Sequence, residues 1–451
     1  MKLNPVSSRI AIIGAGISGL AAAYQLIKAG YDPVIFEKES FVGGRMSSKN
    51  LDGFIIDKAA YTIPETHKNL KRFLKEMEMK KSLVPTPGTY STFSAGKEHK
   101  INIGSSKQFF KSELFSLKSK KEIIKLFIYA RSLGSTLNLA RPRKKTFKLE
   151  QVSAAAYLAE HYDKEILEFV AYPLFSEMYL GTPENNSKIA FLAGIKHLHR
   201  FKIFALDKGM GVLPERLARG MDIRLNTPVI NIHRQAREGP YEIQTGSENP
   251  GTHIFDAVIF AVPSPIVPEL FDDLPGELKE CFLATSYAPS IVTALAVDQQ
   301  YSETSMIISL LRKDFRVLGN IIFDRHKGPF RVPEGKELIT AILCEQASRR
   351  LFHEPNNVII TEVLKEIDFL YPTFSSRLIF SRVYRWQYGA VQLQPGLLFK
   401  QHTARKALKD ELHNLYFAGD GLYWSGLEVS FNTGRQAAEQ IIKKMGKRKR
   451  P

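Results

Sequence analysis

A glycine-rich turn directly after a short apolar run is the feature that most constrains this sequence. Residues 9–13 form a β-branched run of the kind found in buried parallel strands. Residues 14–19 then read Gly-Ala-Gly-Ile-Ser-Gly, and residues 20–29 are rich in strong helix formers. Glycines in this pattern allow a tight turn, close approach of the backbone to a pyrophosphate, and close packing of helix on strand. The sequence therefore predicts a dinucleotide-binding strand, turn and helix.

An acidic residue at the end of the second predicted strand narrows the choice of nucleotide. Residues 33–36 are followed by Glu37, whose carboxylate can accept hydrogen bonds from both ribose hydroxyls. The same carboxylate would repel a 2′-phosphate, which leaves NAD and FAD as candidates at this point. Arg45 follows two glycines and can neutralise pyrophosphate charge through a bidentate contact.

The apolar stretch 10–27 is too short and too broken for a membrane helix. It has 18 residues and contains three glycines, whereas a spanning helix needs about 20 apolar residues. With 451 residues and 44% hydrophobic content, the chain exceeds the size of a single core, which predicts two domains. Its two cysteines, Cys281 and Cys344, exclude a disulfide framework and a cysteine zinc cluster, and they favour a reducing, cytoplasmic setting.

The net charge of +17 is concentrated in two segments. Residues 100–150 carry 13 basic and 3 acidic side chains, and residues 443–450 carry six basic ones. Apolar residues interleave with the lysines of residues 120–133, a pattern that suits the surface of an anionic membrane. A solvated basic helix that covers the core is the equally weighted alternative. Because no recognition motif accompanies the charge, we expect no nucleic-acid partner, and we expect residues 446–451 to be a basic tail.

The remaining pattern alternates between helical and extended segments. Helices are expected over 65–77, 151–180 (interrupted at Asp163 and Pro173), 358–370 and 431–444, and a glycine turn leads into a short helix over 207–218. Strands are expected over 223–233, 241–245, 255–262, 377–386 and 415–418. Four strand-length apolar runs predict an antiparallel sheet in a second domain: 290–297, 306–311, 317–323 and 338–344.

A second turn of glycine and acid, at residues 419–421, opens toward a helix far along the chain. Together with the first turn, it makes the sequence resemble the FAD-dependent amine oxidase superfamily, which includes protoporphyrinogen oxidases, carotenoid-type desaturases and flavin amine oxidases. The motifs that carry the resemblance are GAGISGL (14–20), FEKESFVGGR (36–45), DKGMGVL (207–213), NTPVINI (226–232), FDAVIFAVP (255–263), RWQYGAVQLQPG (385–396) and NLYFAGDGLYWSGLEVSFNTGRQAA (414–438).

The resemblance implies an α/β fold with a discontinuous Rossmann-type FAD-binding domain and a parallel sheet. Its second domain would be α+β, with an antiparallel sheet for substrate binding and a helical, basic insertion over 100–150. We expect the FAD-binding domain to comprise residues 1–75, 206–268 and 404–445, and the substrate-binding domain residues 76–205 and 269–403.

The resemblance also assigns roles to individual residues. The residues expected to bind FAD are Gly14, Ala15, Gly16, Ile17, Ser18, Gly19, Glu37, Lys38, Gly44, Arg45, Val229 (through its backbone, at the adenine), Gly419, Asp420 and Val429. A helix that begins near Phe431 would direct its positive end at the flavin pyrimidine. Aromatic residues expected on the substrate side of the flavin are Trp386, Tyr388, Tyr423, Trp424 and Phe431. No catalytic acid or base is assigned, and no metal is expected at His197 and His199.

Two departures from the family pattern concern the flavin environment. Glycines usually follow the aspartate equivalent to Asp57, but Lys58-Ala59-Ala60 follow here, and Val429-Ser430 replaces a small pair. The segment 290–294 lacks the lysine that is common in amine oxidases, whereas 172–181 and 286–290 are similar to protoporphyrinogen oxidases. Where many of those enzymes have an arginine, this chain has Pro64-Glu65.

The expected activity is hydride removal by FAD from a hydrophobic substrate that can also be anionic, which creates C=C or C=N. A protoporphyrinogen-oxidase-like or desaturase-like enzyme fits this expectation best, and a flavin amine oxidase is the alternative. A flavin-bearing interaction protein without turnover is a third reading, from a different functional class. The substrate, the electron acceptor and the oligomeric state stay open at this stage.

Overall fold

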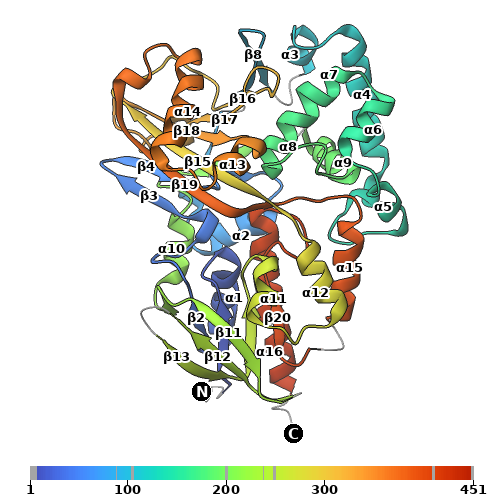
Figure 1. The fold of residues 1–451 in the computed structure, drawn as a ribbon, viewed down its shortest axis with the longest axis vertical. Helices are drawn as coiled ribbons and strands as arrows, with labels where there is room; N and C mark the ends of the chain where they lie inside the picture. The colour runs from blue at the N-terminus through green and yellow to red at the C-terminus, as the bar shows by residue number, and fades with distance from the viewer. Residues whose placement is uncertain are drawn as a thin grey trace.

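The structure is a computed structural model of residues 8–87, 89–102, 106–198, 202–236, 238–246, 250–408 and 412–447. It is elongated and has two halves, each built around one large sheet (Figure 1). A parallel sheet with long helices forms the lower half of the view, and a mixed sheet flanked by helices forms the upper half.

The parallel sheet has five strands in the order β10-β2-β1-β14-β20. Its strands come from distant parts of the chain, and every neighbouring pair is parallel. The central strands are continuous apolar runs because both faces of the sheet are covered. The bounds are β1 (Ile10–Ile13), β2 (Val34–Phe36), β10 (Asp222–Arg224), β14 (Ala257–Phe260) and β20 (Leu415–Phe417).

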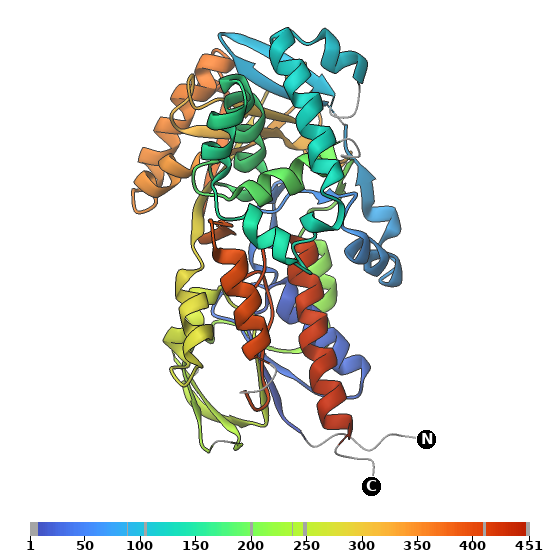
Figure 2. The same cartoon turned by 90° about the vertical axis from the view of Figure 1, so that its right-hand side faces the viewer.

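Two helices from opposite ends of the sequence pack closely together on one face of this sheet. They are α1 (Ile17–Lys28) and α16 (Leu427–Lys447), and α16 runs along most of the lower half in Figure 2. A Cβ on Gly434 of α16 would lie 2.0 Å from the carbonyl oxygen of Ser18 in α1. A Cβ on Gly19 would lie 2.0 Å from the Gly14 carbonyl oxygen. Glycine at these two positions is therefore what allows the helices and the turn to approach one another.

The larger sheet has seven strands in the order β19-β15-β18-β17-β16-β7-β8. All of its neighbours are antiparallel except β16 and β7, which confirms the four strands expected between residues 290 and 344. Helices α13 (Glu345–Leu351) and α14 (Asn356–Leu370) cover one face. The strands are β7 (Thr89–Ser94), β8 (Lys97–Asn102), β15 (Tyr287–Val297), β16 (Ile307–Leu310), β17 (Leu318–Phe323), β18 (Glu337–Leu343) and β19 (Leu378–Val391).

The basic segment is largely helical and forms the outer corner of the upper half (Figure 1). In α4 (Leu117–Ser132), Leu126 and Ala130 are fully buried, whereas Leu117 and Ile128 are 78% and 61% exposed. Screening of the helices within the described residues found none with the length and apolarity needed to span a membrane. The other helices of this part are α3 (Ser106–Lys111), α5 (Lys144–Leu149), α6 (Ala154–His161), α7 (Lys164–Ile166), α8 (Tyr172–Tyr179) and α9 (Lys188–His197).

Smaller elements complete both halves. A three-stranded sheet comprises β11 (Val229–Arg234), β12 (Tyr241–Thr245) and β13 (Gly251–Phe255). The other strands are β3 (Ser48–Leu51), β4 (Phe54–Asp57), β5 (Ile63–Pro64), β6 (Leu83–Pro85) and β9 (Ile203–Leu206). The other helices are α2 (Lys68–Glu76), α10 (Val212–Ala218), α11 (Val267–Leu270), α12 (Gly276–Ala284) and α15 (Leu397–Ala407).

Two strands expected from the sequence are each divided between two sheets. The run 223–233 is split into β10 and β11 because Asn226 takes a left-handed conformation (φ 50°) and Pro228 follows. The run 255–262 is split into β13 and β14 at Asp256, whose carboxylate accepts a hydrogen bond from the Arg9 amide at 2.8 Å. Apolar content alone does not reveal that the chain changes sheets at these points.

Helix boundaries also differ from expectation. The last long helix begins at Leu427, before Phe431, because its first-turn residue Glu428 accepts hydrogen bonds from the Asn69 and Leu70 amides of α2. The interruption expected at Asp163 is confirmed, since this residue caps α7. At Pro173 the interruption takes the form of a change in helix type: residues 164–179 are helical throughout, but Leu167–Ala171 form a π-helical turn directly before α8, which accommodates a proline that has no amide hydrogen to donate. The tail 446–451 lies mostly outside the described residues.

Candidate functional site

The glycine turn between β1 and α1 presents unpaired backbone amides. Gly14 has a φ of 104°, and a Cβ there would lie 2.8 Å from the Ala261 carbonyl oxygen. Gly16 is the N-terminal cap of α1 and offers no capping side chain, while a Cβ at Gly16 would meet no atom within 4 Å. The amides of the first turn of α1 have no partner within the helix, and the space beside Gly16 is open, a combination that suits a phosphate.

Glu37 lies beside this turn at the end of β2. Its Oε2 accepts a hydrogen bond from the Ala15 amide at 2.7 Å, and its Oε1 accepts one from the Glu39 amide at 3.0 Å. Burial raises the pKa of the Glu37 carboxyl, and these two hydrogen bonds oppose that rise. The Thr227 amide donates to the Glu37 carbonyl oxygen at 2.8 Å, so the strand that starts at Val229 lies against the same corner.

Arg45 and Asp420 form an ion pair at 2.9 Å. The Arg45 Nη1 atom also donates to the Gly389 carbonyl oxygen at 2.9 Å, and Tyr287 Oη donates to Asp420 Oδ1 at 2.9 Å. Burial lowers the pKa of Arg45, but the nearby Asp420 carboxylate outweighs burial and raises it. Both carboxylate oxygens of Asp420 are thus engaged, and the pair links the nucleotide turn region to strand β19.

These groups fit an adenine dinucleotide with a diphosphate bridge. The amides of the first turn of α1 suit the diphosphate, and Glu37 suits a ribose. The half-buried cation of Arg45 lies near the turn, because the Gly43 amide donates to the Ala15 carbonyl oxygen at 2.9 Å. Gly44 approaches this turn closely, since a Cβ on it would lie 3.8 Å from the Gly16 Cα. Three other residues expected to bind FAD lie in different environments. Lys38 is exposed, Val429 is half-buried in the first turn of α16, and the Gly419 amide donates a hydrogen bond to the Thr433 hydroxyl. The individual contacts to a cofactor stay predictions.

The aromatic residues expected on the substrate side lie in three different places. Trp386 donates through Nε1 to the Lys58 carbonyl oxygen at 2.9 Å, and Tyr388 packs edge-on against Tyr287. Tyr423 and Trp424 contact each other in the loop after β20. Phe431 lies elsewhere: it is fully buried in the core between α16 and α2, with its ring 4.8 Å from the Phe73 ring. Core packing decides the position of Phe431, so its ring is not available to a substrate in this structure.

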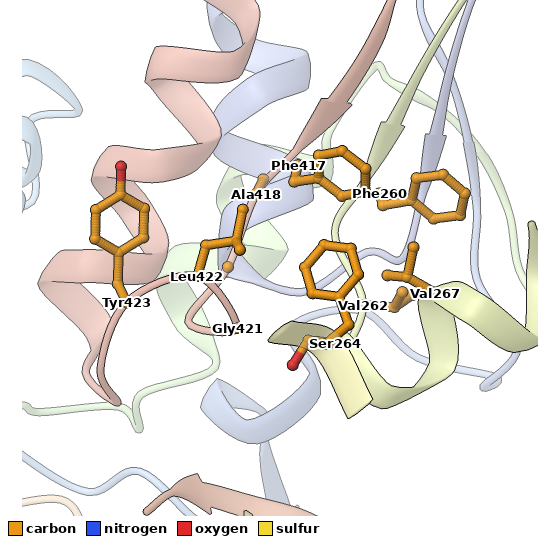
Figure 3. A pocket seen from close by; sticks show the side chains of 11 residues that line it. Phe260, Val262, Ser264, Val267, Phe417, Ala418, Gly421, Leu422 and Tyr423 are labelled. Carbon is orange, nitrogen blue, oxygen red and sulfur yellow. The ribbon is translucent and has the colours of Figure 1, made fainter. Parts of the chain in front are cut away.

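A crevice opens at the carboxyl ends of β14 and β20, where parallel sheets commonly bind ligands (Figure 3). Its internal space is only about 20 Å³, room for about one water molecule. The Ser264 hydroxyl there is buried and has no hydrogen-bond partner among the described residues. The lining residues are Phe260, Val262, Ser264, Val267, Phe282, Phe417, Ala418, Gly419, Gly421, Leu422 and Tyr423.

Asp57, the site of the first sequence departure, is the centre of a buried charge network. Its carboxylate pairs with Lys327 at 3.1 Å and with Arg331, and it accepts a hydrogen bond from the Met210 amide at 2.8 Å. Burial alone would raise the pKa of Asp57, but the Arg331 and Lys327 cations lower it to about 2. The network fixes the start of the loop from Asp57 to Tyr61. This loop passes beside Arg45, because the Ala60 amide donates a hydrogen bond to the Arg45 carbonyl oxygen at 2.9 Å.

Sequence reasoning missed the carboxylate of Glu177. This residue lies on α8 and accepts a hydrogen bond from the Tyr61 hydroxyl through Oε1. Burial raises its pKa to about 7, against the opposing effect of that hydrogen bond. The only signal in the sequence is an acidic residue in the otherwise uncharged run 172–181.

Comparison with known proteins gives consistent results. Residues 17–442 match the family described as flavin containing amine oxidoreductase. Coproporphyrinogen III oxidase of Staphylococcus aureus is 23% identical, with 97% of this chain and 99% of that protein covered. Mitochondrial protoporphyrinogen oxidase of Nicotiana tabacum and 4,4′-diapophytoene desaturase of Staphylococcus haemolyticus are each 26% identical. For these two, the alignments cover 40% and 49% of this chain, but only 34% and 49% of the relatives' own lengths.

Solved structures match over nearly the whole chain. A candidate protoporphyrinogen oxidase from Exiguobacterium sp. 255-15 has a TM-score of 0.76 at 20% identity, covering 98% of this chain and 100% of that one. Cyclohexylamine oxidase from Brevibacterium oxydans has a TM-score of 0.76 at 17% identity, covering 97% of this chain and 99% of that one. At these identities the similarity establishes the α/β fold, with its parallel sheet and its mixed, mostly antiparallel sheet.

Proposed function

The chain belongs to the flavin-containing amine oxidoreductase family, and from this premise we propose that it is an FAD-dependent oxidoreductase acting on a hydrophobic substrate. The reaction removes a hydride from a substrate carbon, with FAD as the two-electron acceptor when it is bound, and releases a proton from the adjacent carbon or nitrogen to water, which forms C=C or C=N as in a protoporphyrinogen-oxidase-like or desaturase-like enzyme. The observation that carries the proposal is the corner where the open amides of α1, Glu37 and Arg45 converge.

The chain's own residues bind and orient both molecules. The amides after Gly16, with Glu37 and Arg45, would hold the two phosphates and the adenosine ribose. The loop from Asp57 to Tyr61 and the strand β19 would flank the ring system, since Trp386 and Arg45 join them. When bound, FAD supplies the two-electron acceptor, and the protein positions the carbon and excludes water.

Two observations favour this branch over a flavin amine oxidase. The segment 290–294 of β15 is fully buried and contains no lysine. The relatives that are covered over nearly their full length include coproporphyrinogen III oxidases. The fold does not discriminate, because an amine oxidase structure matches as well as the porphyrinogen-oxidase-like one.

Anaerobic mixing with candidate substrates tests the proposal. The purified protein should carry FAD, identified after heat release, and its flavin absorbance near 450 nm should bleach with a porphyrinogen or a carotenoid precursor. Bleaching with primary amines alone would favour the amine oxidase. Retention of FAD without bleaching by any of these classes would favour a flavin-bearing interaction protein, and a colourless protein that takes up no FAD would refute the proposal.

We also propose that α4 holds the protein on the cytoplasmic face of an anionic membrane, where hydrophobic substrates accumulate. Leu117, Ile124 and Ile128 lie on its exposed side at helical spacing and are 78%, 38% and 61% exposed. Lys121 and Lys125 on the same side are exposed. Apolar side chains flanked by lysines are the combination that inserts shallowly between anionic headgroups.

A further inference from the structure

Strand β19 lies at the border of the seven-stranded sheet, where it pairs with β15 alone (Figure 1). A border strand directs part of its backbone amides and carbonyl groups away from its neighbour, toward solvent or another chain. The C-terminal part of this outer edge is covered by the same chain. The Tyr388 and Gly389 carbonyl oxygens accept hydrogen bonds from Arg45. The Val391 amide donates one to the Ser425 hydroxyl.

The preceding stretch, Phe380–Trp386, has no such cover. Within the described residues, no hydrogen bond joins its outer backbone groups to another segment. Its pairing with β15 is regular, because the two irregularities of this pair lie beyond the ends of the stretch. Its sequence, FSRVYRW, contains no proline, glycine or lysine. Prolines, lysines and bulges are the usual means of keeping an edge strand from pairing, so this edge is competent to accept a further strand.

The stretch can be reached from solvent. Each of its seven residues is at least partly exposed, and Arg382 belongs to the exposed class. Ile379, directly before the stretch, is 44% exposed. An added strand would therefore meet the edge without displacing any part of the chain that the structure describes.

Two arginines flank this edge from its two faces. Arg382 pairs with Ala294, which packs in the apolar cluster of Phe54, on the face that α13 and α14 do not cover. Arg385 pairs with Ile291, which packs in the cluster beneath α13 and α14. Because side chains alternate along a strand, two residues that are three positions apart point to opposite faces. The edge thus carries one guanidinium on each side.

Neither arginine forms an ion pair with a carboxylate of the described residues. Arg382 donates to the Ser381 carbonyl oxygen at 2.7 Å. Arg385 donates to the Asn356 side chain at 2.7 Å and to the Glu354 carbonyl oxygen, and its Nε atom is buried without a hydrogen-bond partner. Two such groups attract a carboxylate partner. They also oppose pairing of β19 with a second copy of itself, since like charges would come together across the strands.

We propose that Phe380–Trp386 is a docking edge for an extended, acidic segment of another protein, which adds to the seven-stranded sheet as a further strand. Backbone hydrogen bonds would hold the segment, and two carboxylates three residues apart would face Arg382 and Arg385. Acids two residues apart would share one face and reach only one arginine. The inference goes beyond the proposed function and does not depend on a bound flavin.

Two fluorescein-labelled peptides of identical composition test this spacing. TVEVTEVT has its glutamates three residues apart, and TVEVETVT has them two residues apart. Fluorescence anisotropy with the full chain should show about two- to fivefold tighter binding of TVEVTEVT, the ratio expected for one additional cross-strand ion pair. A TVEVTEVT peptide with N-methyl groups at alternate residues, placed to block its pairing edge, should bind at least about tenfold more weakly, because several backbone hydrogen bonds are lost.

Matched variants assign the contacts to the edge. Arg382→Gln should weaken binding of TVEVTEVT and remove its advantage over TVEVETVT, without a change in the thermal melt, because the side chain is exposed. Arg385→Gln should do the same from the other face. Arg219→Gln removes an exposed guanidinium after α10, outside the sheet, and should leave both affinities unchanged. In hydrogen exchange, bound TVEVTEVT should protect amides of Phe380–Trp386.

Four results would overturn the proposal. One is the absence of binding by either peptide up to about 1 mM. Equal affinity for the two spacings would mean that only net charge is recognised, and undiminished binding of the N-methylated peptide would exclude strand addition. A wild-type dimer in sedimentation velocity, with the amides of Phe380–Trp386 already protected, would assign the edge to a second copy of this chain.

Discussion

Arg45 and Asp420 come from opposite ends of the sequence and form an ion pair of 2.9 Å in which the aspartate side chain is 3% exposed. The same arginine binds the Tyr388 and Gly389 carbonyl oxygens of β19. One guanidinium therefore joins the first βαβ unit, the last strand of the parallel sheet and the seven-stranded sheet.

Asp420→Asn should destabilise the protein and weaken FAD binding. It leaves the Arg45 cation largely buried without its carboxylate, a loss that typically costs about 3–5 kcal/mol of unfolding free energy. Urea denaturation of the apoprotein measures the change. A double-mutant cycle with Arg45→Gln should give a coupling free energy of about 1–3 kcal/mol, and independent effects of the two substitutions would contradict a direct pair.

Glu37→Ala should reduce FAD affinity about 10- to 150-fold. The variant lacks the carboxylate and therefore loses a charge-assisted hydrogen bond to the ribose, which corresponds to roughly 1.5–3 kcal/mol of binding free energy. Fluorescence titration of the apoprotein with FAD measures the affinity. Glu160→Ala removes the same kind of side chain at a position of α6 that is 76% exposed, and it serves as the control. Equal FAD affinity in both variants would refute the ribose assignment.

Asp57 should make a measurable contribution to acid stability. Its pKa of about 2 in the folded state lies below the ordinary value, so the folded protein binds fewer protons than the unfolded chain. The stabilisation, about 2 kcal/mol, is complete above the unfolded-state pKa near 4 and is lost as the pH falls toward 2. Unfolding free energies of wild type and Asp57→Asn between pH 3 and 6 check this.

The difference in unfolding free energy between the wild type and Asp57→Asn should narrow as the pH falls from 6 to 3. Asp57→Asn is expected to be less stable throughout most of this range, because Lys327 and Arg331 lose their buried counter-charge. A difference that stays constant with pH would show that the charge of Asp57 is not what stabilises the network.

Gly434→Ala should force α1 and α16 apart. Its Cβ would lie 2.0 Å from the Ser18 carbonyl oxygen, and backbone on both sides leaves no room to yield. We expect a loss of several kcal/mol in unfolding free energy, beyond the usual cost of overpacking of about 1–3 kcal/mol. Gly276→Ala, in α12, meets no atom within 4 Å and should be neutral or slightly stabilising. Thermal melts of the two variants provide the comparison.

The exposed side of α4 should bind anionic vesicles. The protein should sediment with vesicles of phosphatidylglycerol at low salt, remain in the supernatant with phosphatidylcholine, and dissociate as salt is added. Leu117→Ser combined with Ile128→Ser should abolish sedimentation without changing the thermal melt, because these side chains are 78% and 61% exposed. Sedimentation that is unchanged by these substitutions would contradict the assigned surface.

The sequence predicted the elements whose local pattern agrees with their position in the fold. The βαβ unit could be found because each glycine of the turn performs a local task, and the strands of the large sheet could be found because they are long apolar runs. The changes of sheet at Asn226 and Asp256 could not, because they depend on pairing with distant segments. The proposed domain boundaries stay predictions.

Motif spacing predicted a cofactor site at Gly14, Glu37 and Arg45, and the structure places these residues at one corner of the parallel sheet. The spacing did not show that Arg45 and Asp420 bind each other. The partners of Asp57 lie on residues 327 and 331, and no periodicity connects such distant positions. Glu177 was missed because a single carboxylate in an apolar helix becomes informative only once its neighbours are known.

The close contact of Gly434 with Ser18 has a consequence for biosynthesis. The first βαβ unit can form early, but the backbone of α16 that completes its covering is translated long afterwards. Until then the apolar side of α1 is not covered by α16. The nascent protein therefore depends on late docking of one helix before it can retain a prosthetic group. A nonsense mutation after β20 would therefore yield a colourless, degradation-prone product rather than a slow enzyme.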